Sequence, residues 1–365
     1  MATGPSYDII IVGAGSAGCV LANRLTEDGR TRVLLLEAGG KDRDPWLHIP
    51  AGYFKTIFKP NLGWGYRTAP EPGLEGREIP WPRGKVLGGT SSINGMIYIR
   101  GQREDYDHWR QLGLSGWGWE DVLPYFVRAE RQAPDNIPRS DSLHGQEGPL
   151  TVSDGFGEHP LLRAFLQGAE EVGIAPTRDF NGAKQDGAGV YQLTTRGGIR
   201  ASTATAYLKP ARRRANLAII TKALATGVVF EGKRAVGVRF RKHGRTVEAR
   251  AAMVVLSGGA INSPQLLQLS GVGDGDRLSA LGIDIVHDLP AVGQNLADHL
   301  QAQVVYRCKS PITLNDDLAS FRRRAGIFLR YLATRRGPLT SAPSPVGAFV
   351  RSGDHVATAD LQLFM

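Results

Sequence analysis

Cysteine and long apolar runs are both scarce in this 365-residue chain. Its two cysteines, Cys19 and Cys308, cannot build a disulfide framework or a zinc site by themselves, which favours a reducing compartment. No run of about 18 apolar residues occurs, so no segment resembles a membrane span. The first residues also lack the charged and apolar regions of a secretory signal. These absences predict a cytoplasmic protein with no integral membrane segment.

An acidic excess is absent too, because the formal net charge is +9. Basic residues gather at 212–214 and between 322 and 336. Neither cluster belongs to a recognisable nucleic-acid module, so we expect no nucleic-acid partner. In the second cluster, apolar residues alternate with arginines, which predicts a core-facing amphipathic helix. Contact with acidic membrane lipid is the alternative there, and it leaves a peripheral membrane location open.

The strongest local motif lies in the first forty residues. An apolar, β-branched run over 7–12 predicts a strand that is buried on both faces. A glycine-rich turn follows at 13–18, then helical spacing at 19–25, and a second apolar run at 33–36 ends in Glu37. This order of strand, turn, helix, strand and acid predicts a Rossmann-type dinucleotide-binding βαβ unit.

Each glycine of the turn has a physical reason. Gly13 permits the tight turn, Gly15 lets the backbone approach a pyrophosphate, and Gly18 lets the helix pack closely on the strand. The helix N-terminus offers free N–H groups and a positive dipole end to the phosphates. Glu37 stands at the end of the second strand, where its carboxylate can accept both hydroxyls of a ribose. This motif alone does not separate FAD from NAD.

Two further segments carry information about the cofactor. So many small residues over 81–101 predict a backbone that lies against a large flat ring, and its N–H groups can stabilise negative charge on a reduced flavin. This favours FAD over NAD. The segment 258–271 predicts an apolar helix with Ser263 as its N-cap, Pro264 at its first position and Gly271 at its end.

These two segments resemble the two signatures of the glucose–methanol–choline (GMC) oxidoreductase family. The likeness extends over essentially the whole chain, and within the family the chain resembles the choline dehydrogenase and bacterial alcohol dehydrogenase branch in particular. The resemblance implies an FAD-dependent oxidoreductase acting on CH–OH groups, in which an alcohol becomes an aldehyde and hydride passes to flavin N5. The partners that it implies are a small-molecule alcohol substrate and an electron acceptor, either quinone or oxygen.

The resemblance also implies the cofactor-binding residues. The residues that would contact the pyrophosphate are Gly13, Gly15, Ser16, Ala17 and Gly18, and those at the adenosine ribose are Glu37 and Ala38. The flavin would be lined by Val86, Asn94, Gly95, Met96 and Ile97, and the adenine would be met by the hairpin residue Val228. Trp64 is expected either to pack on the cofactor or to be a core residue. Some family members attach FAD through a histidine just before the signature asparagine, where this chain has Ile93, so we expect non-covalent FAD. No metal site is expected.

The catalytic residues are not identified in the sequence. The resemblance implies a histidine base, paired with a second histidine or an asparagine, on a C-terminal segment, whereas the last residues here match a strand in the middle of the family's substrate domain. None of the eight histidines fits the motif, and His299, which follows Asp298, is expected to be structural. We therefore expect a C-terminally truncated portion that is inactive alone. An FAD-binding pseudoenzyme or module without alcohol oxidation is the alternative, and a NAD(P)-dependent dehydrogenase is disfavoured by 81–101.

The length exceeds what one hydrophobic core usually organises, which predicts two domains. We expect an α/β fold in which residues 1–150 and 200–300 form a Rossmann-type FAD-binding domain with a parallel sheet. Residues 151–199 and 301–365 are expected to form the first part of an incomplete antiparallel-sheet substrate domain.

Several strands are expected outside the βαβ unit. Segments 218–220 and 236–240 flank a turn at 231–233, which predicts an antiparallel excursion from the first domain. Segments 303–308 and 347–351 are expected to be two strands of the second domain.

Overall fold

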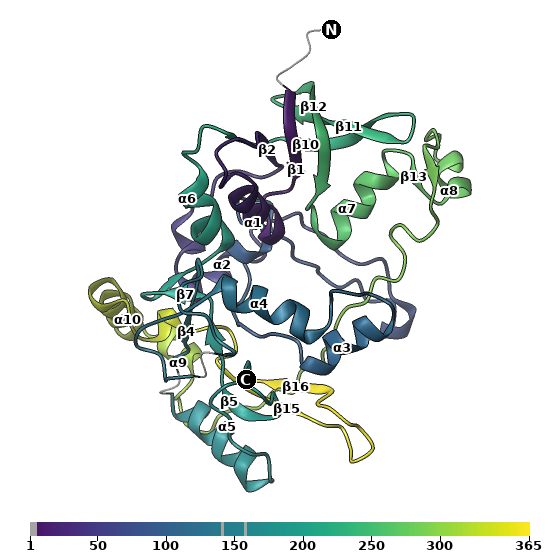
Figure 1. Ribbon diagram of the computed structural model, residues 1–365. Coiled ribbons are helices and arrows are strands. Elements are labelled where there is room, and N and C mark those ends of the chain that lie inside the picture. Colours follow the sequence, from purple (N-terminus) through teal and green to yellow (C-terminus); the bar gives the residue numbers. More distant parts are fainter. Residues whose placement is uncertain (1–5, 140–141, 157–158) are drawn as a thin grey trace. The chain divides into compact units, whose positions relative to one another are not determined.

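The computed structural model describes residues 6–139, 142–156 and 159–365 (Figure 1). The chain divides into two compact units. Unit 1 comprises residues up to 43, 55–94 and 202–304, and unit 2 comprises 44–54, 95–201 and 305–365. This division differs from the expected one chiefly at 95–150, which cluster with unit 2 instead of with the first strands.

Unit 1 is built on a six-stranded mixed sheet (Figure 1). In spatial order its strands are β10 (Leu224–Glu231), β11 (Arg234–Lys242), β12 (Arg245–Leu256), β1 (Ser6–Val12), β2 (Val33–Glu37) and β9 (Leu217–Thr221). Strands β12, β1, β2 and β9 are parallel, whereas β10, β11 and β12 are antiparallel neighbours. The expected excursion is therefore part of the main sheet, because β12 pairs with β11 along its first half and with β1 along its second.

The first strand is buried on both faces along its second half, as the sequence predicted, and the second strand is buried on both faces too. Ile10 and Ile11 of β1 and Leu34 and Leu35 of β2 are all buried. Successive residues of a strand point to opposite faces, so burial of adjacent residues requires cover on both sides.

The hairpin turn at 231–233 is confirmed, but one of its expected strands is wrong. Gly232 has a φ of +57° between β10 and β11, and these two strands pair with each other. Segment 218–220 belongs instead to β9, which pairs in parallel with β2. An apolar run predicts a strand without naming its partner, and here the parallel edge of the sheet takes it.

The helices of unit 1 follow its strands. They are α1 (Ser16–Leu25), α6 (Lys209–Ala211), α7 (Gly259–Gln268) and α8 (Gly275–Ala280), with the one-turn segments η3 (Pro72–Leu74), η4 (Gly89–Ser92) and η5 (Ala204–Leu208) and the short pair β13 (Val272–Gly273) and β14 (His287–Asp288). Helix α7 begins five residues earlier than expected, so Ser263 is not its cap and Pro264 lies inside it. Gly258 already has helical backbone angles, and only Ser257 and Gly258 separate the end of β12 from the helix.

Unit 2 contains short sheets and peripheral helices. Its strands are β3 (Glu130–Gln132), β4 (Leu150–Asp154), β5 (Gly187–Val190), β6 (Gln192–Leu193), β7 (Thr195–Arg196), β8 (Ile199–Arg200), β15 (Val346–Val350) and β16 (Leu361–Phe364). Its helices are α3 (Arg103–Gln111), α4 (Trp119–Ala129), α5 (Pro160–Glu171), α9 (Leu314–Ala319) and α10 (Phe321–Thr334), with the one-turn segments η1 (Pro45–Leu47), η2 (Pro50–Gly52) and η6 (Pro338–Thr340). The short helix α2 (Tyr53–Thr56) contains the boundary between the units.

One of the two strands expected at the end of the chain forms. Strand β15 matches segment 347–351 to within one residue, and it pairs with β5 on one side and β16 on the other. Segment 303–308 forms no strand, and Val305 and Tyr306 are largely exposed. A β-prone sequence becomes a strand only where a neighbouring strand can pair with it, and the described residues provide none.

A charged cluster is buried inside unit 2. The guanidinium of Arg100 is bonded to the carboxylate of Glu130. His144 lies between two carboxylates, with Nδ1 at 2.8 Å from Glu130 and Nε2 at 2.9 Å from Asp179. Burial alone would lower the pKa of His144, but the hydrogen bonds to Asp179 and Glu130 outweigh it and raise the pKa to about 9. His144 is therefore a charged structural residue at neutral pH.

We predict that this cluster makes the protein less stable at alkaline pH than at neutral pH. The pKa of His144 is raised above its ordinary 6.5, so its stabilising contribution is complete below that pH and is lost as pH rises through about 9. Urea unfolding at pH 7 and pH 10 should show a loss of up to about 3 kcal/mol. His144→Gln should remove this difference and the exposed control His108→Gln should keep it. An unchanged pH difference in His144→Gln would contradict this assignment.

Candidate cofactor site

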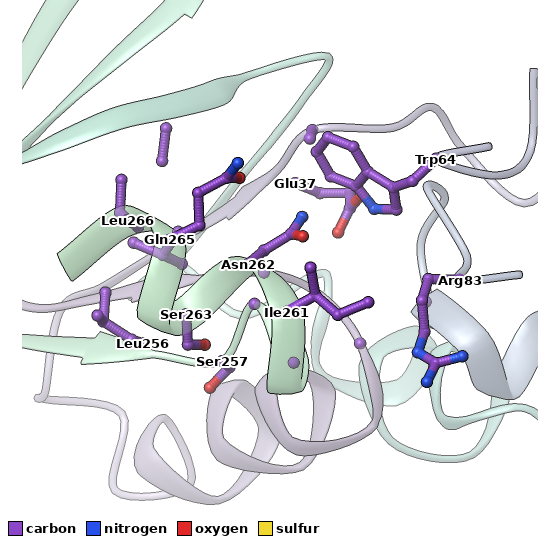
Figure 2. Close-up of a pocket in the computed structure, with 18 of the residues that line it drawn as sticks. Glu37, Trp64, Arg83, Leu256, Ser257, Ile261, Asn262, Ser263, Gln265 and Leu266 are labelled. Atoms are coloured by element: carbon purple, nitrogen blue, oxygen red, sulfur yellow. The ribbon is translucent and has the colours of Figure 1, made fainter. Parts of the chain in front are cut away.

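A pocket of about 640 Å³ lies within unit 1, where the parallel strands end (Figure 2). Val12, Leu36 and Leu256, from the last residues of β1, β2 and β12, line it. In α/β sheets ligands bind beyond the carboxyl ends of parallel strands, and pockets of this volume hold small molecules and cofactors. The sheet therefore forms the floor of a candidate ligand site.

Two helices begin at this pocket, and neither has a side-chain cap. Gly15 is the N-cap of α1, and Ser16 and Ala17 in its first turn line the pocket. Gly258 is the N-cap of α7, and its first turn, Gly259–Asn262, lines the same pocket. The first N–H groups of a helix have no partner inside the helix, and the helix dipole is positive there. Two uncapped N-termini at one pocket suit an anionic ligand.

The three glycines of the turn meet different surroundings. Gly13 has a φ of +100°, and a Cβ placed there would lie 2.5 Å from the carbonyl oxygen of Ser257. A Cβ at Gly18 would lie 1.9 Å from the carbonyl oxygen of Gly13. At Gly15, by contrast, the only nearby atom is Cα of Gly89, at 4.0 Å. Close packing therefore requires glycine at 13 and 18, whereas at 15 the missing side chain leaves space at the pocket.

Glu37, at the end of β2, connects the turn to the second strand. Its carboxylate is 5% exposed and accepts hydrogen bonds from the backbone N–H of Ala14 at 2.9 Å and of Gly39 at 2.7 Å. Burial raises the pKa of the Glu37 carboxyl, while these two bonds and the charge of Lys85 oppose the rise. Each oxygen accepts one described bond, so each keeps a free lone pair for a ligand hydroxyl.

Trp64, which lines the pocket, belongs to a stack of aromatic and cationic side chains. Nζ of Lys85 lies 4.5 Å from the ring centre of Trp64, and the Trp64 and Tyr66 rings stack at 5.7 Å. The Tyr66 hydroxyl donates to Oδ1 of Asn262 in α7, at 2.7 Å. Figure 2 shows Trp64 beside Glu37, with Asn262 directed toward both. The stack therefore joins the segment around residue 64 to the helix that begins at the pocket.

The small residues of 81–101 have a different primary cause from the one expected. A Cβ at Gly84 would lie 2.3 Å from the Gly89 carbonyl oxygen, and one at Gly89 would lie 2.7 Å from Cα of Gly15. At Gly88 it would lie 2.2 Å from Oγ of Ser92. These glycines are required because the chain packs against itself. Gly84 and Gly89 also line the pocket, so the stretch forms part of the site.

A sequence profile described as GMC oxidoreductase matches residues 7–301 of the chain. The match includes the glycine turn, Glu37, the 81–101 stretch and helix α7.

The chain belongs to the GMC oxidoreductase family. It is 46% identical to the mitochondrial choline dehydrogenase of Mus musculus over 364 residues, covering 98% of this chain and 60% of that enzyme. It is 44% identical to the alcohol dehydrogenase (acceptor) of Pseudomonas putida over 359 residues, covering 98% of this chain and 64% of that enzyme. The solved FAD-dependent oxidoreductase of Chaetomium thermophilum matches with a TM-score of 0.84 and 30% identity, covering 94% and 61% of the two chains. The chain thus spans about 60% of the length of these GMC proteins.

Part of the predicted cofactor set lies together in this GMC chain. Of the predicted residues, those that line the pocket are Gly13, Gly15, Ser16, Ala17, Glu37, Ala38 and Trp64. Gly18, Val86 and Val228 belong to the same unit but are not among the lining residues. Val86 is fully buried, and the backbone N–H of Val228 donates to Oγ of Ser270 at 2.8 Å. A direct cofactor contact of these three residues stays a prediction.

The last predicted group, residues 94–97, does not line the pocket either. Asn94 belongs to unit 1 and Gly95, Met96 and Ile97 belong to unit 2. Met96 packs with Leu193 and Ala342 in a small apolar cluster. Their place against a flavin also stays a prediction.

Several lining residues were missed in the sequence. Segment 223–225 lines the pocket because it follows β9, another parallel strand that ends at this edge. Its signal was the apolar run at 218–220, which was assigned to the hairpin. Asn262 and Gln265 belong to segment 258–271, for which the sequence predicts only a helix, and Ser257 precedes that segment. A helix that follows soon after a strand end begins at the same edge of the sheet, which places all three residues at the pocket.

The pocket contains no candidate for a catalytic base. Among the described lining residues only Glu37 and Arg83 can titrate, and both oxygens of Glu37 bind backbone amides. His299 is exposed, and its neighbour Asp298 accepts a hydrogen bond from Nε1 of Trp81 at 2.6 Å. His299 is not among the lining residues.

We predict that two alanine substitutions in the turn have different effects, one chiefly on FAD affinity and the other chiefly on the free energy of unfolding. Gly15→Ala should change the free energy of unfolding by less than about 1 kcal/mol, because its methyl group meets only Cα of Gly89, at an ordinary contact distance of 4.0 Å. The methyl group would occupy pocket space, so added FAD should bind at least about tenfold more weakly, a cost of about 1.4 kcal/mol. Gly18→Ala should instead lower the free energy of unfolding by about 1–3 kcal/mol through overpacking. Equal effects of both variants in urea unfolding and flavin titration would contradict this division.

Proposed function

We propose that this chain is the FAD-binding portion of an oxidoreductase that acts on CH–OH groups and converts an alcohol to an aldehyde. The observation that carries the proposal is the pocket at which two uncapped helices begin beside a buried carboxylate. Two relatives are named for alcohol substrates, a choline dehydrogenase and an alcohol dehydrogenase. The residues present fit FAD, and bound FAD would supply the hydride acceptor.

The phosphate end of the cofactor has a defined place in this proposal. The N–H groups of Ser16 and Ala17 would donate to the pyrophosphate, because no side chain caps this helix. Arg83 is the only cationic residue among the described lining residues and adds a compensating charge. The empty space at Gly15 allows the phosphates to approach the backbone.

The adenosine end is assigned to Glu37 and its neighbour Ala38. The free lone pairs of the Glu37 carboxylate would accept the ribose hydroxyls, and each such charge-assisted bond is worth about 1.5–3 kcal/mol. A negative carboxylate at this point also repels a phosphate on the ribose. The Glu37 carboxylate thus favours a ribose whose hydroxyls carry no phosphate.

We propose that FAD is held without a covalent bond. Ile93 is buried and has no nucleophilic atom. The thiol of Cys19, in α1, is buried as well, and burial raises its pKa to about 12, so it is not a thiolate at neutral pH.

Acid precipitation of the purified flavoprotein tests this point. The yellow chromophore should be released into the supernatant, because only non-covalent contacts hold it. Flavin that stays in the washed precipitate would show a covalent bond and overturn the proposal.

An FAD-binding module without alcohol oxidation is the second candidate. The observation that favours it is the absence of a base among the described residues that line the pocket. The two candidates differ in what the remaining length of the relatives contributes, since the chain spans 60–64% of the two enzymes.

Alcohol oxidation decides between the two candidates. We predict that residues 1–365 bind FAD but oxidise primary alcohols at least about 10²–10⁴-fold more slowly than a form extended along the coding sequence, since a general base contributes about that much. Flavin reduction is followed by absorbance with a panel of alcohols, and reoxidation is followed with a soluble quinone and with oxygen. Comparable rates in the two forms would place the base within these residues, and no turnover by the extended form would favour the module.

A further inference from the structure

The sequence predicts that the apolar side of helix α10 packs against the core, and the structure differs. Only Tyr331 is buried, and its hydroxyl donates to the carbonyl oxygen of Gly198 at 3.0 Å. A Cβ at Gly198 would lie 2.2 Å from the carbonyl oxygen of Arg335, so the end of the helix packs closely on the β7–β8 turn. These contacts fix one side of α10 to unit 2 (Figure 1).

The other side of α10 carries an exposed apolar stripe. Phe321 is 74% exposed, Phe328 40%, Leu329 65% and Leu332 51%. Positions four, seven and eleven residues apart lie on one face of a helix, so these side chains form a continuous strip. The core-facing prediction is wrong, because the described residues leave these four side chains between 40% and 74% exposed.

Positive charge borders this stripe. Successive residues of a helix are rotated by 100° around its axis, which places Arg322 next to one edge of the stripe and Arg324 next to the other edge. Residues 321–336 contain six arginines and no acidic residue. Among the described residues, one ion pair links α10 to the preceding helix, between the exposed Arg323 and the partly exposed Asp317 at 3.4 Å.

We propose that α10 docks on a membrane surface rich in anionic lipid, with its axis in the membrane plane. An apolar stripe between arginines is the pattern of a helix whose apolar side chains enter the acyl boundary while its cations meet the headgroups. No described helix is long and apolar enough to cross a membrane, so the contact would be peripheral. Charge complementarity selects the lipid: a symmetric second copy would bring two such arginine clusters together, which is repulsive.

Vesicle sedimentation of the full chain tests this proposal. Phosphatidylcholine vesicles with and without phosphatidylglycerol serve as the probe. The wild type should sediment with the anionic vesicles only, and less so as salt rises. Arg322→Gln with Arg324→Gln should weaken binding by about 25-fold, since each arginine near an anionic surface contributes roughly a factor of five. Phe328→Ser with Leu332→Ser should weaken it at least about tenfold.

The matched control is Arg239→Gln with Arg241→Gln, which removes the same charge from the exposed face of β11. It should bind anionic vesicles like the wild type. Equal loss in this control would mean that net charge alone is responsible and would overturn the proposal. Absence of wild-type binding would overturn it as well. Self-association that disappears with Phe328→Ser and Leu332→Ser, without vesicle binding, would assign the stripe to a second copy instead.

Discussion

The buried carboxylate of Glu37 holds the turn after β1 and the end of β2 in one fixed arrangement. One oxygen binds the amide of Ala14 and the other binds the amide of Gly39. Burying a carboxylate costs free energy unless it is hydrogen-bonded, and these two donors together with the charge of Lys85 offset that cost. Ala14 lies directly before the N-cap of α1, so the position of that helix start follows from this contact.

The start of α1 then determines what the pocket can bind. Its N-cap is a glycine and its N–H groups have no side-chain cap, and the same is true of α7. Natural helices usually satisfy these groups with a side chain, water or a ligand. Two helix starts without a side-chain cap beside one pocket suit a binding site whose anionic ligand replaces the caps. The glycines at 84 and 89 keep this space open by letting the chain pack closely behind it.

Local constraints made part of this site predictable from sequence. Gly18 packs against the carbonyl oxygen of Gly13, and Glu37 bonds the amides of Ala14 and Gly39, so the spacing within the first forty residues records that geometry. The choice of strand partner is not recorded in this way. The apolar segment 218–220 predicted a strand correctly, but its pairing with β2, which places segment 223–225 at the pocket, depends on the whole sheet.

The same limit explains the predictions that were wrong. Segment 303–308 has the residues of a strand, yet the described chain offers it no partner. The stripe of α10 has the spacing of a core-facing helix, and spacing alone does not say whether protein, lipid or solvent covers the apolar face. Both cases depend on what packs against a segment, which is a property of the assembled structure.

Hydrogen exchange at single-residue resolution, with and without FAD, tests the central claim most directly. The account predicts that FAD slows exchange of the amide protons of Ser16 and Ala17, because the pyrophosphate accepts their hydrogen bonds. The amides at the start of α8, which has its own cap from Asp274, should not change and serve as the internal control. FAD bound with unchanged exchange at Ser16 and Ala17 would contradict the account.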